Sequence, residues 1–203
     1  MNTYIIKGDL CFSRSMDEIV CLEQGSIVVE QGRVAGVFQT LPERYAALPV
    51  MDYGRRLILP GMSDLHVHAP QFAFRGLGMD MELLEWLNTY TFPEESKYKD
   101  LDYAEKAYSS FTSHLLRSTT TRAAIFATIH VPATELLMQK LEDAGLGCYV
   151  GKVNMNRNSP VYLREISTNQ ALRDTERWIC ETKARYPHVK PILTPRFIPS
   201  CTD

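Results

Sequence analysis

The chain has 203 residues, of which 45% are hydrophobic and 23% are charged, as is typical of globular proteins. Its formal net charge of −2 gives neither the basic surface that nucleic acid requires nor a polybasic membrane-binding segment, so we expect neither partner. No secretion signal or long apolar run is evident. The five cysteines are odd in number and lack CxxC spacing, which indicates reduced thiols in the cytoplasm rather than disulfides or a cysteine zinc site.

The first 56 residues are predicted to form a small β-layer. Short segments there are β-branched or alternate in polarity, namely 3–6, 18–22, 25–30 and 33–38. Turn residues such as Gly8 and Gly32 separate them. The pattern favours a first domain, residues 1–56, that is part of a β-sandwich rather than helical.

From residue 57 onward, strands and helices are expected to alternate. The expected strands are 57–59 continuing into 63–68, then 122–129, 146–155 and 189–198. The expected helices are 81–90, 102–117, 132–144 and 169–186. Such alternation is typical of βα units around a parallel sheet.

Four such units make half of a (β/α)8 barrel, which takes roughly 250 residues in all. The sequence therefore predicts an α/β fold in which residues 57–203 form the first four β/α units of a TIM-type barrel. Four strands cannot close that barrel, and an open half leaves strand edges and apolar helix faces in water. We therefore expect either a fragment or a chain whose other half comes from a partner.

Two histidines separated by one residue mark the first expected barrel strand. Residues two apart in a strand share a face, so His66 and His68 should project together at the strand's C-terminal end, where barrel enzymes place their chemistry. Two neutral imidazoles can hold a divalent ion there, most naturally zinc. A bare HxH pair is a weak signal, and the alternative is two solvent-facing histidines on an edge strand. The preceding Pro60-Gly61 and the following Pro70 favour the metal site.

A longer stretch around these histidines resembles the amidohydrolase superfamily. The segment LILPGMSDLHVHAPQ is similar to the first-strand signature of that superfamily, and HAPQFAFRGLGMDMELLEWLNTYTFPEE resembles guanine deaminases in particular. The later segments FATIH, VGKVNMN and TPRFIPSC are similar to the same family in the same order. The resemblance spans residue 57 to the C-terminus, and the first 56 residues fit the family's N-terminal β-layer.

This resemblance implies a zinc-dependent hydrolase that converts guanine to xanthine and ammonia in purine catabolism or salvage. It implies that His66 and His68 are ligands of one divalent ion. The substrate-binding residues that it implies are His68, Ala69, Pro70, Gln71, Arg196 and Phe197. The Gln71 amide both donates and accepts, the Arg196 guanidinium is a donor fork, and the Phe197 ring can stack on a purine. Without the resemblance, these three would be assigned as a loop cap, a surface ion-pair partner and a core residue.

The resemblance also implies that the remaining metal ligands and a proton-shuttling glutamate lie beyond residue 203. We therefore expect no catalytic residue in this chain beyond the metal ligands, and weak zinc binding without turnover for the chain alone. His130 follows the second barrel strand but matches no ligand position, so it is expected in a pocket wall or a loop hydrogen bond. His114 is expected on a helix, and His188 at the opposite end of the barrel.

Two alternatives remain open. The first is another amidohydrolase that acts on a different N-heterocycle, which Gln71, Arg196 and Phe197 would distinguish. The second is a catalytically inactive fragment that needs a partner chain, as the missing ligands and the open barrel suggest. Because enzymes of this family are commonly homodimers, the resemblance implies a cytoplasmic homodimer when the protein is complete.

Overall fold

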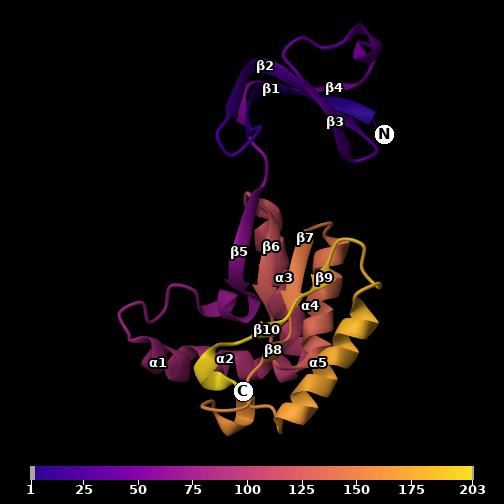
Figure 1. Cartoon of the computed structure of the whole chain (residues 1–203). Coiled ribbons are helices and arrows are strands. Elements are labelled where there is room, and N and C mark those ends of the chain that lie inside the picture. Colours follow the sequence, from indigo (N-terminus) through magenta and orange to yellow (C-terminus); the bar gives the residue numbers. More distant parts are fainter. Residues whose placement is uncertain (1–2, 203) are drawn as a thin grey trace. The chain divides into compact units, whose positions relative to one another are not determined.

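The computed structural model describes residues 3–202, so the outer ends of the two predicted domains, Met1, Asn2 and Asp203, lie outside the described residues. The chain divides into two compact units, Met1–Pro60 and Gly61–Asp203 (Figure 1). The division falls at Pro60 rather than after residue 56, because the last strand of the first unit runs on to Ile58.

The first unit is a four-stranded sheet in the order β3-β2-β1-β4. Its elements are β1 (Thr3–Ser13), β2 (Ile19–Glu30), β3 (Arg33–Phe38), the short 3-10 turn η1 (Glu43–Tyr45) and β4 (Val50–Ile58). The β1–β2 and β2–β3 pairs are antiparallel, whereas β4 runs parallel to β1. Its membership of a larger β-sandwich stays a prediction.

Two expectations for this region were wrong in detail. The segments 18–22 and 25–30 form one strand, since Gly25 stays paired with Gly8 instead of turning the chain. Leu57 and Ile58 belong to β4, where they pair with Asp9 and Leu10, and not to the first barrel strand. Pro60 has no backbone N–H to continue a ladder, which separates β4 from the strand that follows.

The second unit contains a parallel sheet in the order β5-β6-β7-β9 and a small parallel pair of β8 with β10. The strands are β5 (Met62–His68), β6 (Thr120–Phe126), β7 (Gly147–Gly151), β8 (Val153–Asn154), β9 (Lys190–Pro191) and β10 (Thr194–Pro195). The helices are α1 (Leu83–Trp86), α2 (Phe92–Ser96), α3 (Leu101–Arg117), α4 (Val131–Asp143) and α5 (Thr168–Thr182). This arrangement confirms the α/β fold and is that of a partial barrel.

Three helices cover the parallel sheet, with α3 against β6, α4 against β7 and α5 against β9. Their ends carry the expected signals: the Asp100 carboxylate caps α3, the Ser167 hydroxyl caps α5, and Gly145 follows α4 with a φ of 70°. The core between sheet and helices contains Tyr108 and Trp178, both fully buried. Among the described residues, no helix combines the length and apolar character needed to cross a membrane.

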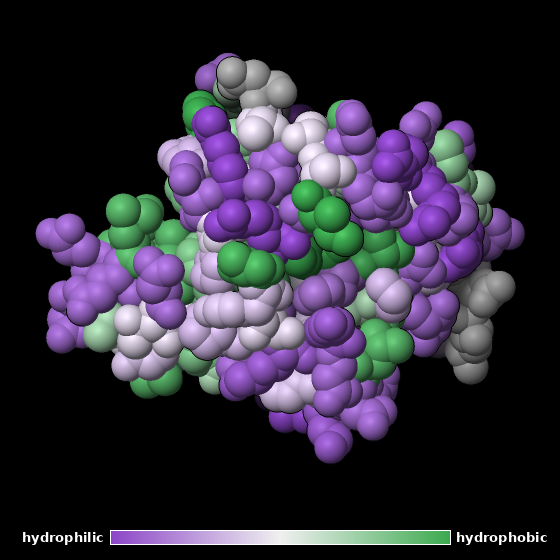
Figure 2. Space-filling view, turned by 90° about the horizontal axis from the view of Figure 1, so that it is seen from below, coloured by the Kyte–Doolittle hydropathy of each residue, from purple (hydrophilic) through white to green (hydrophobic). Residues whose placement is uncertain are grey.

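The remaining turns of the second unit lie in its loops. They are η2 (Ala69–Phe74), η3 (Leu87–Thr91), η4 (Lys97–Lys99), η5 (Val161–Leu163) and η6 (Ile198–Ser200). Large hydrophobic side chains in and near these turns are exposed, among them Leu77, Val161 and Ile198. Figure 2, which views the molecule from below Figure 1, shows hydrophobic residues gathered between hydrophilic ones on that face. Exposed apolar surface of this kind is expected of a sheet that has not closed into a barrel.

The expected single strand 189–198 is wrong, because it consists of β9 and β10 separated by Ile192 and Leu193. Each short strand ends in a proline, Pro191 or Pro195, which cannot donate to a ladder. The expected strand 146–155 is likewise divided into β7 and β8.

The expected helix 81–90 is also wrong in form. It begins as α1, widens into the π-helical turn η3, and continues as α2. Pro93, at the start of α2, has no N–H to donate and its ring crowds the preceding turn, which favours a wider turn there.

Candidate functional site

A cavity of about 610 Å³ lies at the C-terminal end of β5. Its lining residues come from β5 and the η2 turn, from α1 and η3, from α3, and from the segment after β10. They are His66, Val67, His68, Gln71, Phe72, Arg75, Leu83, Trp86, Leu87, Phe111, Arg196 and Phe197. The structure thus brings together five of the residues singled out from the sequence: both histidines, Gln71, Arg196 and Phe197.

The two histidines lie side by side on the cavity wall. Their ring centroids are 5.2 Å apart, and both rings pack on Phe126, at 4.9 Å for His66 and 4.5 Å for His68. At the backbone, the Asp64 carboxylate accepts a hydrogen bond of 3.1 Å from the His66 N–H, where the register of β5 against β6 shifts. The strand end and the Phe126 ring therefore hold both imidazoles at one place.

His68 is neutral at ordinary pH. Burial, with smaller contributions from the Arg196 and His66 charges, lowers the pKa of His68 to about 3. Its Nδ1 atom is buried, and no hydrogen-bond partner for it lies among residues 3–202. A neutral imidazole with an unused ring nitrogen is the form that binds a metal ion.

The donor set fits part of a metal site. Within residues 3–202, no three His, Cys, Asp or Glu side chains are grouped so that they could hold a metal ion. Zinc sites use three or four protein ligands, so His66 and His68 fit two of them.

Gln71 and Arg196 are joined by a carboxylate that the sequence analysis did not identify. Glu95 Oε2 accepts from Arg196 Nη1 at 2.6 Å, and Glu95 Oε1 accepts from Gln71 Nε2 at 3.3 Å. The side chains of Arg196 and Glu95 are only 4% and 2% exposed. Burial raises the pKa of Glu95, and the Arg196 charge opposes that rise. The TFPEE segment was noted for its resemblance, but nothing in two adjacent glutamates says which of them contacts Gln71 and Arg196.

Aromatic and apolar side chains form the rest of the wall. Trp86 donates its ring N–H to the Leu77 carbonyl at 3.0 Å, which fixes the indole beside the cavity. Arg75 lies 3.9 Å above the Phe72 ring and also lines the cavity, although no sequence signal pointed to it. The cavity therefore combines flat apolar surfaces with a few fixed polar groups, as small-molecule sites do.

Ala69 and Pro70 occupy a different position from the other predicted substrate residues. Both are buried in the first turn of η2 and are not among the residues that line the cavity. The Pro70 carbonyl accepts from the Tyr98 hydroxyl at 3.3 Å. Their predicted contact with substrate stays a prediction, while their observed part is to hold the turn that carries Gln71.

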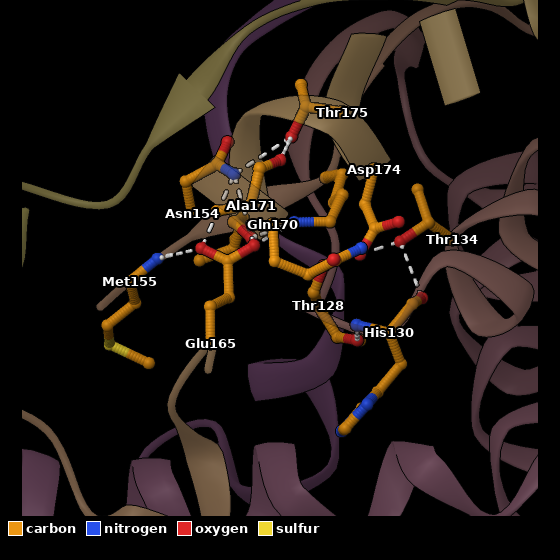
Figure 3. Close-up of polar contacts among 12 residues, drawn as sticks. Thr128, His130, Thr134, Asn154, Met155, Glu165, Gln170, Ala171, Asp174 and Thr175 are labelled. Atoms are coloured by element: carbon orange, nitrogen blue, oxygen red, sulfur yellow. Dashed lines mark hydrogen bonds and ion pairs between the residues drawn. The ribbon is translucent and has the colours of Figure 1, made fainter. Parts of the chain in front are cut away.

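The other three histidines do not line this cavity, although His114 of α3 packs on its lining residue Phe72 with ring centroids 5.0 Å apart. His130 precedes α4 and lines another cavity, of about 440 Å³, with Lys99 and Arg177. Its backbone N–H donates to the Thr128 hydroxyl at 2.7 Å (Figure 3). His188 pairs with Glu142 at 2.7 Å.

A buried polar network surrounds Glu165 and connects β8 with α5. Lys152 and Glu165 form an ion pair with side chains 2% and 9% exposed. The Glu165 carboxylate also accepts from the Met155 N–H at 2.9 Å and from the Asn154 amide, whose nitrogen donates in turn to the Thr175 hydroxyl at 2.9 Å (Figure 3). This network ties β8 to α5 and to the loop between them.

Comparison with known proteins points to one family for this chain. The Amidohydrolase family model matches residues 57–203. Guanine deaminase of Dictyostelium discoideum is 44% identical over 155 residues, which cover 76% of this chain and 34% of that protein. Guanine deaminase of Escherichia coli is 36% identical over 188 residues, which cover 88% of this chain and 41% of that protein.

A solved structure extends the comparison. The guanine deaminase from C. acetobutylicum, with guanine bound in its active site, is 46% identical and superposes with a TM-score of 0.94. The match covers 99% of this chain and 48% of that one, so the chain spans about half the length of this relative. Amidohydrolases of the guanine deaminase type are generally metal-dependent hydrolases. The chain belongs to the amidohydrolase family, and its similarity within that family is to guanine deaminases.

Proposed function

We propose that this chain carries part of the active site for the hydrolytic deamination of guanine to xanthine and ammonia. The observation that supports this most is the single cavity that brings His66 and His68 together with Gln71, Arg196 and Phe197. The 46% identity to a deaminase with guanine bound adds the substrate class.

Guanine is bound by complementary polar groups and by stacking. It offers a carbonyl and ring nitrogens as acceptors, and ring and amino N–H groups as donors. The Arg196 fork can donate to an acceptor, and the Gln71 amide can supply both kinds of contact. Phe197 offers its ring face to the purine. A base whose polar pattern differs would leave buried groups unpaired, at a cost of roughly 1–3 kcal/mol each.

His66 and His68 would hold one zinc ion beside this purine site. A zinc ion bound there would lower the pKa of water and so provide hydroxide at neutral pH. The residues of this chain hold both imidazoles against Phe126, burial keeps His68 neutral, and the neighbouring side chains orient the base next to them. Because only two donors are grouped within residues 3–202, we expect zinc binding by the chain alone to be weak.

Two measurements on the purified chain test this function. Zinc binding, followed by competition with a chelating dye, should be weak and should be abolished by replacing His66 and His68 together with Ala. His188→Ala, which alters a histidine paired with Glu142, is the matched control and should leave zinc binding unchanged. We expect no xanthine release from guanine, and full activity of the chain alone would contradict the proposal that its site is partial.

The substrate is tested by binding. Guanine should bind the chain more tightly than adenine, and Arg196→Ala should remove that preference. Retained zinc binding without a preference for guanine would favour the alternative, an amidohydrolase of another N-heterocycle.

The assembly and its location are further parts of this proposal. The family resemblance supports a homodimer for the complete protein, and the dispersed cysteines support a cytoplasmic location. Light scattering on the complete protein would test the first, and fluorescence microscopy of a tagged protein the second.

A further inference from the structure

Glu95 lies beneath the cavity and touches two of its polar lining residues. Its two carboxylate oxygens serve different partners, Oε1 the Gln71 amide and Oε2 the Arg196 guanidinium. Gln71 follows β5 and Arg196 follows β10, so this one side chain joins residues that lie far apart in the chain. Building on the proposed function, we propose that Glu95 is a positioning residue that orients Gln71 and Arg196 for recognition of the purine.

The carboxylate decides which way the Gln71 amide faces. An ionised carboxylate only accepts hydrogen bonds, so Gln71 must turn its NH₂ group toward Glu95. The amide oxygen and the second N–H of Gln71 are then left for the cavity that Gln71 lines. An acceptor at this place matches the N–H groups of guanine, which adenine does not carry at the same ring positions.

The Arg196 guanidinium is held from two sides by α2. Glu95 accepts from its Nη1, and the Phe92 ring lies 5.4 Å from its central carbon. Ion pairing and cation–π contact fix the plane of the fork, so its remaining N–H groups point in set directions. The Glu95 charge also balances that of Arg196, which leaves this side of the cavity suited to a neutral base.

The unusual helix before Glu95 explains how it reaches this position. Trp86 lines the cavity from the end of α1, and Glu95 follows in α2 after the π-helical turn η3. The wider turn adds one residue, which rotates everything after it by about 100° relative to a regular α-helix. Without that rotation, Trp86 and Glu95 would not both face the site. The π turn that Pro93 favours is thus part of the positioning.

An isosteric variant separates positioning from folding. Glu95→Gln keeps the size of the side chain but has one acceptor oxygen and no charge, so it can no longer offer a separate oxygen to each of Gln71 and Arg196. Glu94→Gln is the matched control, because the neighbouring Glu94 is also buried but pairs with Lys97 and Tyr103 instead. Equilibrium dialysis with radiolabelled guanine and adenine measures both affinities on one preparation. Their ratio does not depend on the fraction of the protein that is folded.

We expect Glu95→Gln to weaken guanine binding about tenfold and to change adenine binding less than about twofold. Glu94→Gln should leave the ratio of the two affinities unchanged. In a Gln71→Ala background, Glu95→Gln should reduce the affinity for guanine by a smaller factor than it does in the unmodified chain. Part of the effect of Glu95 on guanine binding passes through Gln71.

The outcomes separate this inference from the proposed function. If the unmodified chain prefers guanine and Glu95→Gln keeps that preference, the positioning role is wrong and the proposed substrate stands. If the unmodified chain shows no preference for guanine over adenine, the proposed substrate is wrong and the role of Glu95 is wrong with it.

Discussion

Within residues 3–202, ion pairs whose two side chains are both almost fully buried occur in the second unit, alongside exposed pairs, and not in the first. In the first unit, ion pairs such as Arg14 with Glu18 and Lys7 with Asp52 lie on the surface, with side chains 38–63% exposed. In the second unit, Lys152 with Glu165 and Arg196 with Glu95 are almost fully buried.

The difference follows from what each pair connects. The first unit is held by ladders between strands that are mostly neighbours in sequence, so its surface charges can stay hydrated. The buried pairs of the second unit instead fix polar groups at cavities, since Arg196 lines the cavity of the two histidines and Glu165 lines another of about 280 Å³. A buried pair contributes little net stability compared with apolar packing, but removing one partner is costly. Buried charge in this chain therefore marks where side chains must be held in place.

Removing one charge of a buried pair should have the largest effect on stability. Lys152→Met leaves the Glu165 carboxylate buried without its cation, and we expect the second unit to lose about 3–5 kcal/mol of unfolding free energy. Both tryptophans, Trp86 and Trp178, lie in this unit, so fluorescence during urea unfolding measures it separately. The double variant Lys152→Met/Glu165→Gln should recover part of the loss, and a loss below about 1 kcal/mol for Lys152→Met would show that the pair is not desolvated.

Acidification should destabilise the second unit through His68. The pKa of this histidine is lowered from 6.5 to about 3 in the folded chain, so between these values the unfolded chain binds a proton that the folded chain does not. Stability therefore falls as the pH drops below about 6.5, and at pH 5 the loss relative to pH 7 should be about 2 kcal/mol. Urea unfolding of the metal-free chain at both pH values, compared with His68→Gln, measures this contribution. An equal pH dependence in both proteins would contradict it.

Removing an exposed charge from the first unit should have a small effect. Arg14 and Glu18 form a pair of 2.6 Å whose side chains are 63% and 49% exposed. Arg14→Met should cost less than about 1 kcal/mol, because exposed pairs are hydrated and screened. Hydrogen exchange of the amides in β1 and β2, followed by mass spectrometry, reports on this unit. A loss as large as that of Lys152→Met would remove the distinction between the units.

A cross-link within the first unit should leave the second unit unchanged. Cys11 and Cys21 pair directly across β1 and β2, with Sγ atoms 3.6 Å apart. Although both are free thiols here, oxidation by diamide should join them, because a small movement brings them to the roughly 2.05 Å of a disulfide. Thiol titration should detect the loss of both, Cys21→Ser should prevent it, and tryptophan fluorescence should give the same unfolding midpoint. A shift in that midpoint would show that the units unfold together.

The local features of this chain were determined by its sequence. The signals that begin and end α3, α4 and α5 act within a few residues, so these helices could be predicted to within a few residues. The spacing of His66 and His68 likewise gives two imidazoles on one wall, since that depends on the geometry of a single strand. Alternation also located β1, β2 and β3 of the first unit, although β1 runs on to Ser13 and β2 is continuous, whereas β4 was not predicted.

Only the tertiary structure decided which residues meet at the site. The carboxylate of Glu95, one of two adjacent glutamates, reaches Gln71 and Arg196 because a π-helical turn rotates its helix and because the segment after β10 passes over it. The break between β9 and β10 depends on whether their prolines face a partner strand, which only the assembled sheet specifies. Hydrophobic periodicity records which face of an element is buried. It does not record which distant charge that face will meet.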